Sequence, residues 1–273
     1  MAIPVKIQPR LSDGLKKFQP ILTQARAKDI NESDTVVIIT DILTDVFGFE
    51  KYGEITSEYA IKKTFCDLAI KIDGKPRFLI EVKAIGIDLK TDHIRQTVDY
   101  GSNAGVDWVI LTNGIQWKVY KIIFSKPISN DLVYEFDLLK LSNKKDEDLE
   151  LLFMVSKESL SKSTLEDFHN KKQILSKYFI GNLILSEPLV NLLRKIIRKI
   201  SPEIKVEAEN IVEVLENEIL KRDLQEGEKA IEAKKKIEKY FKNQVPKTRP
   251  TKEDTAGITS DATENAVQND RVI

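Results

Sequence analysis

This sequence of 273 residues has little cysteine and histidine, and its formal net charge is zero. The only cysteine, Cys66, can form neither an intrachain disulfide nor a thiolate zinc cluster. The two histidines, His93 and His169, argue against a histidine-based zinc hydrolase and against a serine–histidine triad. The 43 basic and 43 acidic residues cancel, so the overall charge does not point to nucleic acid as a partner. Any case for DNA must therefore rest on local features.

Long hydrophobic runs are absent as well. The longest aliphatic run, Val36–Ile39, is far too short to cross a bilayer, and the first residues lack the apolar stretch of a signal peptide. We therefore expect a cytoplasmic protein without membrane association. The composition, 41% hydrophobic and 32% charged, is typical of a compact core that carries exposed charged helices.

The spacing of the apolar residues predicts an α/β core. It indicates a helix at 31–47, strands at 54–61, 64–72 and 77–83, a helix at 89–104, and strands at 106–112 and 115–124. A helical connection between Lys83 and Val106 would make the flanking strands parallel, which predicts a mixed central sheet flanked by helices. We assign this α/β domain to residues 31–140, preceded by a lead-in at 1–30 with a short helix near 12–17.

The rest of the chain has a different character. Charged and aliphatic residues at helical spacing predict a helical region at 141–245, and the Thr-, Asp- and Asn-rich end predicts a disordered tail at 246–273. Aliphatic spacing in Ile211–Leu220 suits packing on a partner helix, which leaves a protein partner or a homo-oligomer open. The basic stretch Arg194–Lys199 either contacts a phosphate backbone or forms a solvated helix face, and its mixed aliphatic content favours the second.

Two acidic residues and a lysine lie on neighbouring predicted strands. Glu81 and Lys83 are two residues apart, so they share one face of their strand. Asp67 lies on the preceding strand, which the Asp73-Gly74 turn makes antiparallel. If this dipeptide alone is the loop, Asp67 falls opposite Ile80 and points to the wrong face.

A second register brings the two carboxylates together. A loop that also includes Lys75, or a bulge beside Pro76, places Asp67 opposite Glu81. The turn by itself does not decide between the two registers. A metal-dependent site therefore needs the second one.

Converging carboxylates suit a hard divalent cation. Asp67 and Glu81 would bind Mg²⁺ or Mn²⁺ through oxygen, and the Val82 carbonyl could add a further ligand. Such an ion activates water and polarises a phosphate, while Lys83 stabilises negative charge, and together these groups serve phosphodiester hydrolysis. The alternative for the same residues is an ion-paired cluster on a solvated sheet face.

Four blocks resemble the N-terminal nuclease domain of type I restriction enzyme R subunits, a member of the PD-(D/E)xK superfamily. They occur in consistent order over residues 30–125: Asn31-Glu32-Ser33-Asp34-Thr35, Ile80-Glu81-Val82-Lys83-Ala84, Gln96-Thr97-Val98-Asp99-Tyr100 and Gly105-Val106-Asp107-Trp108-Val109-Ile110-Leu111-Thr112-Asn113-Gly114. The E-x-K triplet alone is weak evidence, whereas the ordered set is specific. The resemblance implies a restriction-endonuclease-like core that acts on DNA.

The resemblance also implies roles for single residues. Asp67 and Glu81 would bind the metal and Lys83 would act in catalysis. Gln96 matches the glutamine of the family's Q-x-x-x-Y element, one helical turn before Tyr100.

Several points stay open or depart from the family pattern. Glu32 resembles an additional metal-binding carboxylate on the first helix, with Glu58 as its competitor, and Cys66 stands where the superfamily has a proline. The sequence has no G-x-x-x-x-G-K-[ST] phosphate loop, so we expect a nuclease module without an ATPase motor. The alternative is a non-catalytic module that binds DNA or protein on the same fold.

Overall fold

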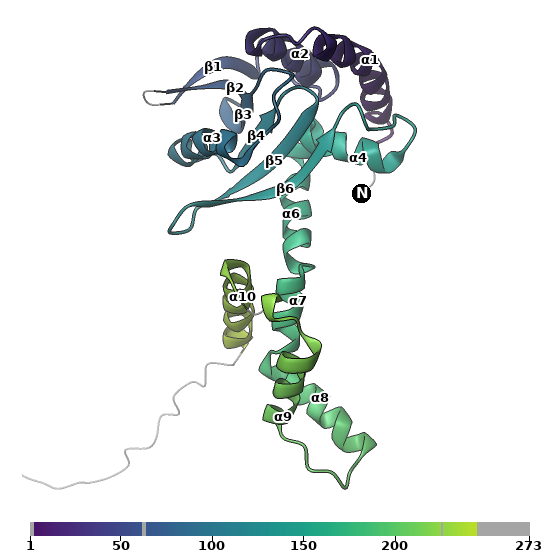
Figure 1. Cartoon of the computed structure of the whole chain (residues 1–273), viewed down its shortest axis with the longest axis vertical. Coiled ribbons are helices and arrows are strands. Elements are labelled where there is room, and N and C mark those ends of the chain that lie inside the picture. The colour runs from purple at the N-terminus through teal and green to yellow at the C-terminus, as the bar shows by residue number, and fades with distance from the viewer. Residues whose placement is uncertain (1–2, 62–63, 225, 245–273) are drawn as a thin grey trace, which may run out of the picture. The chain divides into compact units, whose positions relative to one another are not determined.

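The computed structural model describes residues 3–61, 64–224 and 226–244. It divides into two compact units, Met1–Leu175 and Ser176–Ile273, which we describe separately (Figure 1). The tail expected at 246–273 lies outside the described residues. In the ranges described, no helix combines the length and the apolar character needed to cross a membrane.

A six-stranded sheet forms the centre of the first unit, with its strands in sequence order. The strands are β1 (Ile55–Ile61), β2 (Thr64–Ile72), β3 (Lys75–Val82), β4 (Trp108–Thr112), β5 (Gln116–Ile123) and β6 (Ser129–Asp137). All neighbours are antiparallel except β3 and β4, which are parallel and are connected through helix α3 (Thr91–Ala104). The mixed sheet and its helical crossover are therefore as predicted.

Strand β6 was not predicted. Its first residues are polar, and the β5–β6 pairing shifts register between Val119 and Tyr120. A shift of this kind interrupts the two-residue alternation by which a half-buried strand is recognised in a sequence.

Helices cover both faces of the sheet (Figure 1). Helices α1 (Gln8–Ala27) and α2 (Glu32–Asp45) contribute to one apolar layer, together with α4 (Asp146–Val155). Helix α3 contributes to the other layer. Asn31 caps α2, because its side chain accepts a hydrogen bond from the Asp34 backbone N–H at 2.9 Å.

The first unit extends beyond both predicted domain limits, 30 and 140. The short helix expected near 12–17 is the 20-residue helix α1, whose buried face includes Leu11, Leu15 and Leu22. Of the prolines in this helix, Pro9 lies in the first turn, where the missing N–H costs nothing, and Pro20 lies inside the helix. At the other end, α4, α5 (Lys157–Ser161) and α6 (Thr164–Ile174) belong to the same unit.

The second unit is helical, as predicted. It contains α7 (Lys177–Ile184), α8 (Glu187–Ile200), α9 (Ala208–Val214) with a π-helical continuation (Leu215–Ile219), a 3₁₀ turn (Arg222–Leu224) and α10 (Glu228–Gln244). One small apolar cluster of this unit is centred on Val190, Ile211 and Leu215.

Candidate active site

A β-bulge sets the register of the site. The aspartate–glycine dipeptide alone forms the turn between β2 and β3, but Arg77 has no partner in the described β2–β3 pairing and shifts the register by one residue. Leu68 therefore pairs with Ile80. The next residues along, Asp67 and Glu81, come level with each other, which is the register that the site requires.

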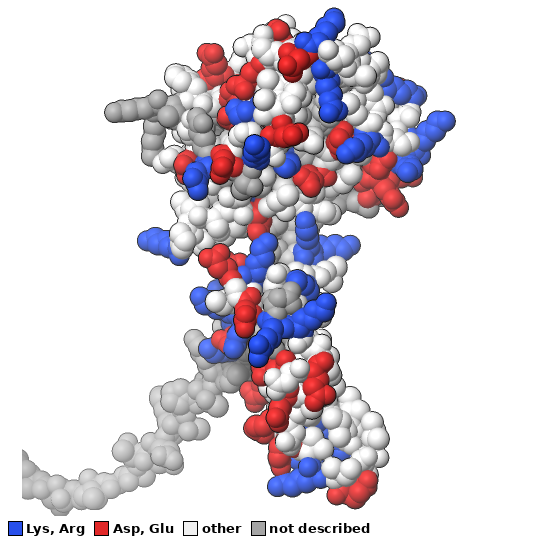
Figure 2. All heavy atoms as spheres, in the orientation of Figure 1, with Lys and Arg blue, Asp and Glu red and all other residues white. Residues whose placement is uncertain are grey.

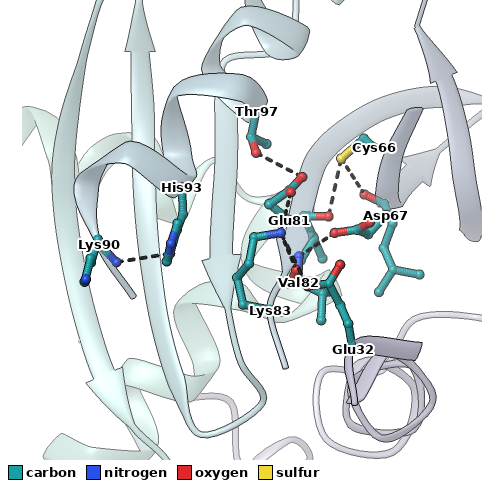
Figure 3. A network of polar contacts seen from close by, with 11 residues as sticks. Glu32, Cys66, Asp67, Glu81, Val82, Lys83, Lys90, His93 and Thr97 are labelled. Atoms are coloured by element: carbon teal, nitrogen blue, oxygen red, sulfur yellow. Dashed lines mark hydrogen bonds and ion pairs between the residues drawn. The ribbon is translucent and has the colours of Figure 1, made fainter. Parts of the chain in front are cut away.

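The Glu81 carboxylate is held by two donors (Figure 3). Lys83 Nζ donates to Glu81 Oε1 at 2.8 Å and to the Val82 carbonyl at 2.9 Å. Thr97 Oγ1, fully buried on α3, lies 3.3 Å from Glu81 Oε2. Since the Glu81 side chain is only 8% exposed, the cluster does not lie on a solvated sheet face.

Asp67 reaches the same strand from β2. Its Oδ2 accepts the backbone N–H of Val82 at 2.7 Å, and its side chain is half-buried. The two carboxylates and the Val82 carbonyl thus gather at the carboxyl end of β3 (Figure 3). In open α/β sheets this end of a parallel strand is the usual place for a binding site.

Of the two competing extra carboxylates, Glu32 contacts the cluster. Its Oε2 lies 3.6 Å from Lys83 Nζ, and its side chain is 49% exposed at the start of α2. Glu58 is exposed on β1, at a backbone φ of +48°, and makes no polar contact within the described residues. The Gln96 side chain lies outside the described part of the structure, and Tyr100 is buried in the α3 layer.

Burial and charge shift the pKa values of the cluster. Burial raises the pKa of Asp67, against the opposing effect of the Val82 N–H. Burial also raises the pKa of Glu81, only partly offset by the Lys83 hydrogen bond. For Lys83, burial acts to lower the pKa, but the hydrogen bond and the charge of Glu81 outweigh it and the pKa is raised. Shifts of this kind are common at functional sites and also occur in structural ion-pair networks.

The thiol beside the cluster is inert. Cys66 is fully buried and donates to the Ile80 carbonyl at 3.3 Å. Burial, reinforced by the negative charges of Glu81 and Asp67, raises the pKa of the thiol to about 12. A thiol that stays protonated at neutral pH is a poor nucleophile.

Asn113 shapes the chain that follows Lys83. Its side-chain oxygen accepts the N–H of Gln116 at 2.7 Å, and its amide donates to the Ile87 carbonyl at 2.9 Å. The Lys83 N–H donates to the Thr112 carbonyl at 2.9 Å. Neither Asn113 nor Thr97 was among the predicted site residues, although both lie within the quoted blocks.

The donor atoms of the site suit a hard cation. Two carboxylates and a carbonyl are oxygen ligands of the kind that Mg²⁺ accepts, with water completing the shell. The Lys83 ammonium, however, contacts Glu81 Oε1 and the Val82 carbonyl, two of the oxygens that a metal would use. Within the ranges that the structure describes, no group of three or more His, Cys, Asp and Glu side chains has the spacing of a metal site, so Glu32 does not complete a three-carboxylate set.

Residues 39–132 match the family model described as type I restriction enzyme R protein N terminus. This range contains Asp67, Glu81 and Lys83 and begins after Glu32, which therefore lies outside the match. The match confirms the resemblance for this segment. No curated protein and no solved structure gives a significant match to the chain.

Proposed function

We propose that this chain, which is similar over residues 39–132 to the N terminus of type I restriction enzyme R proteins, is a metal-dependent endonuclease-like hydrolase of DNA phosphodiester bonds. One observation carries the proposal. Asp67, Glu81 and Lys83 gather at the end of β3, with the Glu81 carboxylate buried and held in place by two donors. An ion-paired surface cluster needs neither the burial nor the second donor.

Asp67, Glu81 and the Val82 carbonyl are the residues that would hold Mg²⁺ or Mn²⁺. A bound divalent ion supplies an activated water and neutralises charge on the phosphate. Thr97 orients Glu81 through Oε2, which leaves Oε1 facing Lys83. The Asp67 Oδ2 bond to the β3 backbone fixes the second carboxylate in the same way.

Lys83 and Glu32 act on the substrate side of the site. The Lys83 ammonium is a compact positive charge that can stabilise a phosphate oxygen as negative charge develops there. Glu32 Oε2 lies 3.6 Å from this ammonium, so Glu32 can orient Lys83. Because the Glu32 side chain is half-exposed, its charge is screened by solvent and leaves the positive charge of Lys83 available to a phosphate. The resemblance also implies a catalytic role for Gln96, whose side chain lies outside the described part of the structure.

Plasmid cleavage tests the proposal. Purified protein with Mg²⁺ or Mn²⁺ should convert supercoiled plasmid to nicked or linear forms, and Lys83→Ala should abolish the conversion. Lys75→Ala is the matched control, because Lys75 is an exposed lysine on the same strand. Plasmid that stays intact in both metals, or equal cleavage by wild type and Lys83→Ala, would contradict the proposal.

A second candidate is a non-catalytic DNA- or protein-binding module. The observation that favours it is the Lys83 ammonium, which occupies oxygens that a metal would need. On this reading the cluster is a structural ion pair. Calorimetric titration with Mn²⁺ separates the two candidates, because metal binding that is lost in Asp67→Ala supports the nuclease and its absence in the wild type supports the module.

A further inference from the structure

Helix α8 has an apolar band that is wider than the surface α9 covers. On one side of α8, Val190 is buried in the small cluster with Ile211 and Leu215, and Leu193 and Ile197 pack against that cluster. This side joins α8 to α9 as a helical hairpin within the second unit. The packing accounts for only part of the apolar surface of α8.

The adjacent side of α8 carries a stripe of exposed aliphatic residues. Leu192, Ile196 and Ile200 follow each other at four-residue spacing, with exposed fractions of 55%, 46% and 75%. Residues at this spacing lie above one another on one helix face. A continuous exposed apolar stripe on a helix indicates a surface that is covered by a partner.

The two helices of the hairpin carry opposite charge. Helix α8 has four basic residues and one acidic residue, whereas α9 and its π-helical continuation have only acidic ones. In Figure 2 the visible face over α8 is largely uncharged, whereas acidic side chains gather over α9. Any partner must therefore suit a basic, apolar helix that lies next to an acidic one.

Only some of these charges are satisfied within the hairpin. Arg194 and Arg198 lie 3.5 and 3.8 Å from Glu207 Oε2. On the other flank of the stripe, Lys195 and Lys199 are exposed and have no ion-pair partner in the described ranges, and the same holds for two acidic residues of α9, Glu209 and Glu213.

We propose that the stripe on α8 packs against α9 of a second copy of this chain, and that α9 packs in return against α8 of that copy. A two-fold axis parallel to the hairpin gives each α8 its own α9 on one side and the second copy's α9 on the other, all antiparallel, as in a four-helix bundle. Lys195 and Lys199 are one turn apart, and so are Glu209 and Glu213. The two pairs therefore match in spacing and in charge across the contact.

Other partners fit these features less well. A basic amphipathic helix also binds anionic membranes, but the acidic residues of α9 beside it would be repelled by the same lipid surface. DNA offers phosphates to Lys195 and Lys199 but nothing to an aliphatic stripe. Pairing of α8 with α8 would bring basic residues together. The second copy's α9 offers acidic residues to the lysines. Val214, which is 44% exposed, and Ile219 of the π-helical continuation, which is 63% exposed, offer apolar surface to the stripe.

The mass of the full chain in solution tests this proposal. Sedimentation velocity of the wild type in low salt, without metal or DNA, should give twice the chain mass of 31.2 kDa. Ile196→Asp should give the single-chain mass, with far-ultraviolet circular dichroism showing unchanged helix content. In the double variant Lys195→Glu/Lys199→Glu, the dimer dissociation constant should rise at least roughly 10-fold, because the new glutamates face acidic residues of the second copy.

Charge exchange makes the test specific. The dimer of the variant Glu209→Lys/Glu213→Lys should also be weakened. Mixing this variant with Lys195→Glu/Lys199→Glu should restore dimer formation, because opposite charges then face each other again. The control Lys235→Glu/Lys239→Glu makes the same charge change on exposed lysines of α10 and should leave the mass unchanged.

Three outcomes would overturn the proposal. One is a single-chain mass for the wild type at all concentrations. Another is a dimer that survives Ile196→Asp and both charge reversals. The third is binding of the wild type to anionic vesicles, lost in Lys195→Glu/Lys199→Glu, with no dimer in solution. None of these measurements depends on nuclease activity, so the dimer and the proposed function can fail independently.

Discussion

Replacing Lys83 with methionine separates a catalytic site from a structural ion pair. The substitution keeps a long unbranched side chain and removes the ammonium group, together with its bonds to Glu81 Oε1 and the Val82 carbonyl. A metal ion that binds to these oxygens must first displace the ammonium. The variant should therefore lose cleavage and gain affinity for the metal at the same time.

The size of the gain in metal affinity follows from the Lys83 hydrogen bond that a metal ion no longer has to break. A hydrogen bond to a charged group contributes about 1.5–3 kcal/mol, and the lower end applies to Lys83 because its side chain is 21% exposed. About 1.5 kcal/mol corresponds to a Kd roughly tenfold lower. Without metal, the same loss leaves Glu81 with a single donor, Thr97, and should destabilise the fold by about 1.5 kcal/mol.

Two assays measure these effects. Calorimetric titration with Mn²⁺ gives the Kd of wild type and variant, and urea denaturation with a chelator gives the free energy of unfolding. Lys75→Met is the matched control, since it removes an exposed lysine from the other end of β3. Metal affinity that is unchanged or weaker in Lys83→Met would refute the reasoning, because the metal would then not share oxygens with Lys83.

Three further predictions concern the carboxylates of the site. Because burial raises the pKa of Asp67, its contribution to stability is present below the ordinary aspartate range and is lost as pH rises through the raised value. The unfolding free energy of wild type relative to Asp67→Asn, from urea titrations, should therefore fall over that interval. Thr97→Val removes a hydrogen-bond donor to Glu81 without changing the side-chain size. It should lower the free energy of unfolding by about 1 kcal/mol and shift the acidic limb of the pH–cleavage profile to higher pH, whereas Thr97→Ser should do neither. Glu32→Gln should slow plasmid cleavage several-fold while Glu58→Gln leaves it unchanged, since only Glu32 contacts the site lysine; equal effects would exclude this role for Glu32.

Local patterns in the sequence predicted most of the elements. Alternating or continuously apolar segments located strands β1 to β5, and helical spacing located α2 and α3. These features depend on neighbours a few residues apart, and their signal is therefore contained in short windows. Helix α1 was under-predicted because its proline content outweighed the spacing of its apolar residues.

The sequence by itself determined which residues are candidates for the site, since two carboxylates and a lysine on neighbouring strands are read directly from spacing. Only the tertiary structure decided that they meet. The bulge at Arg77 sets the register, and nothing in the aspartate–glycine turn specifies it. The choice of Glu32 over Glu58 and the placement of Thr97 behind Glu81 depend on how α2 and α3 pack on the sheet. Such contacts join residues distant in the chain, and their geometry is set by packing of the whole unit rather than by local conformational preference.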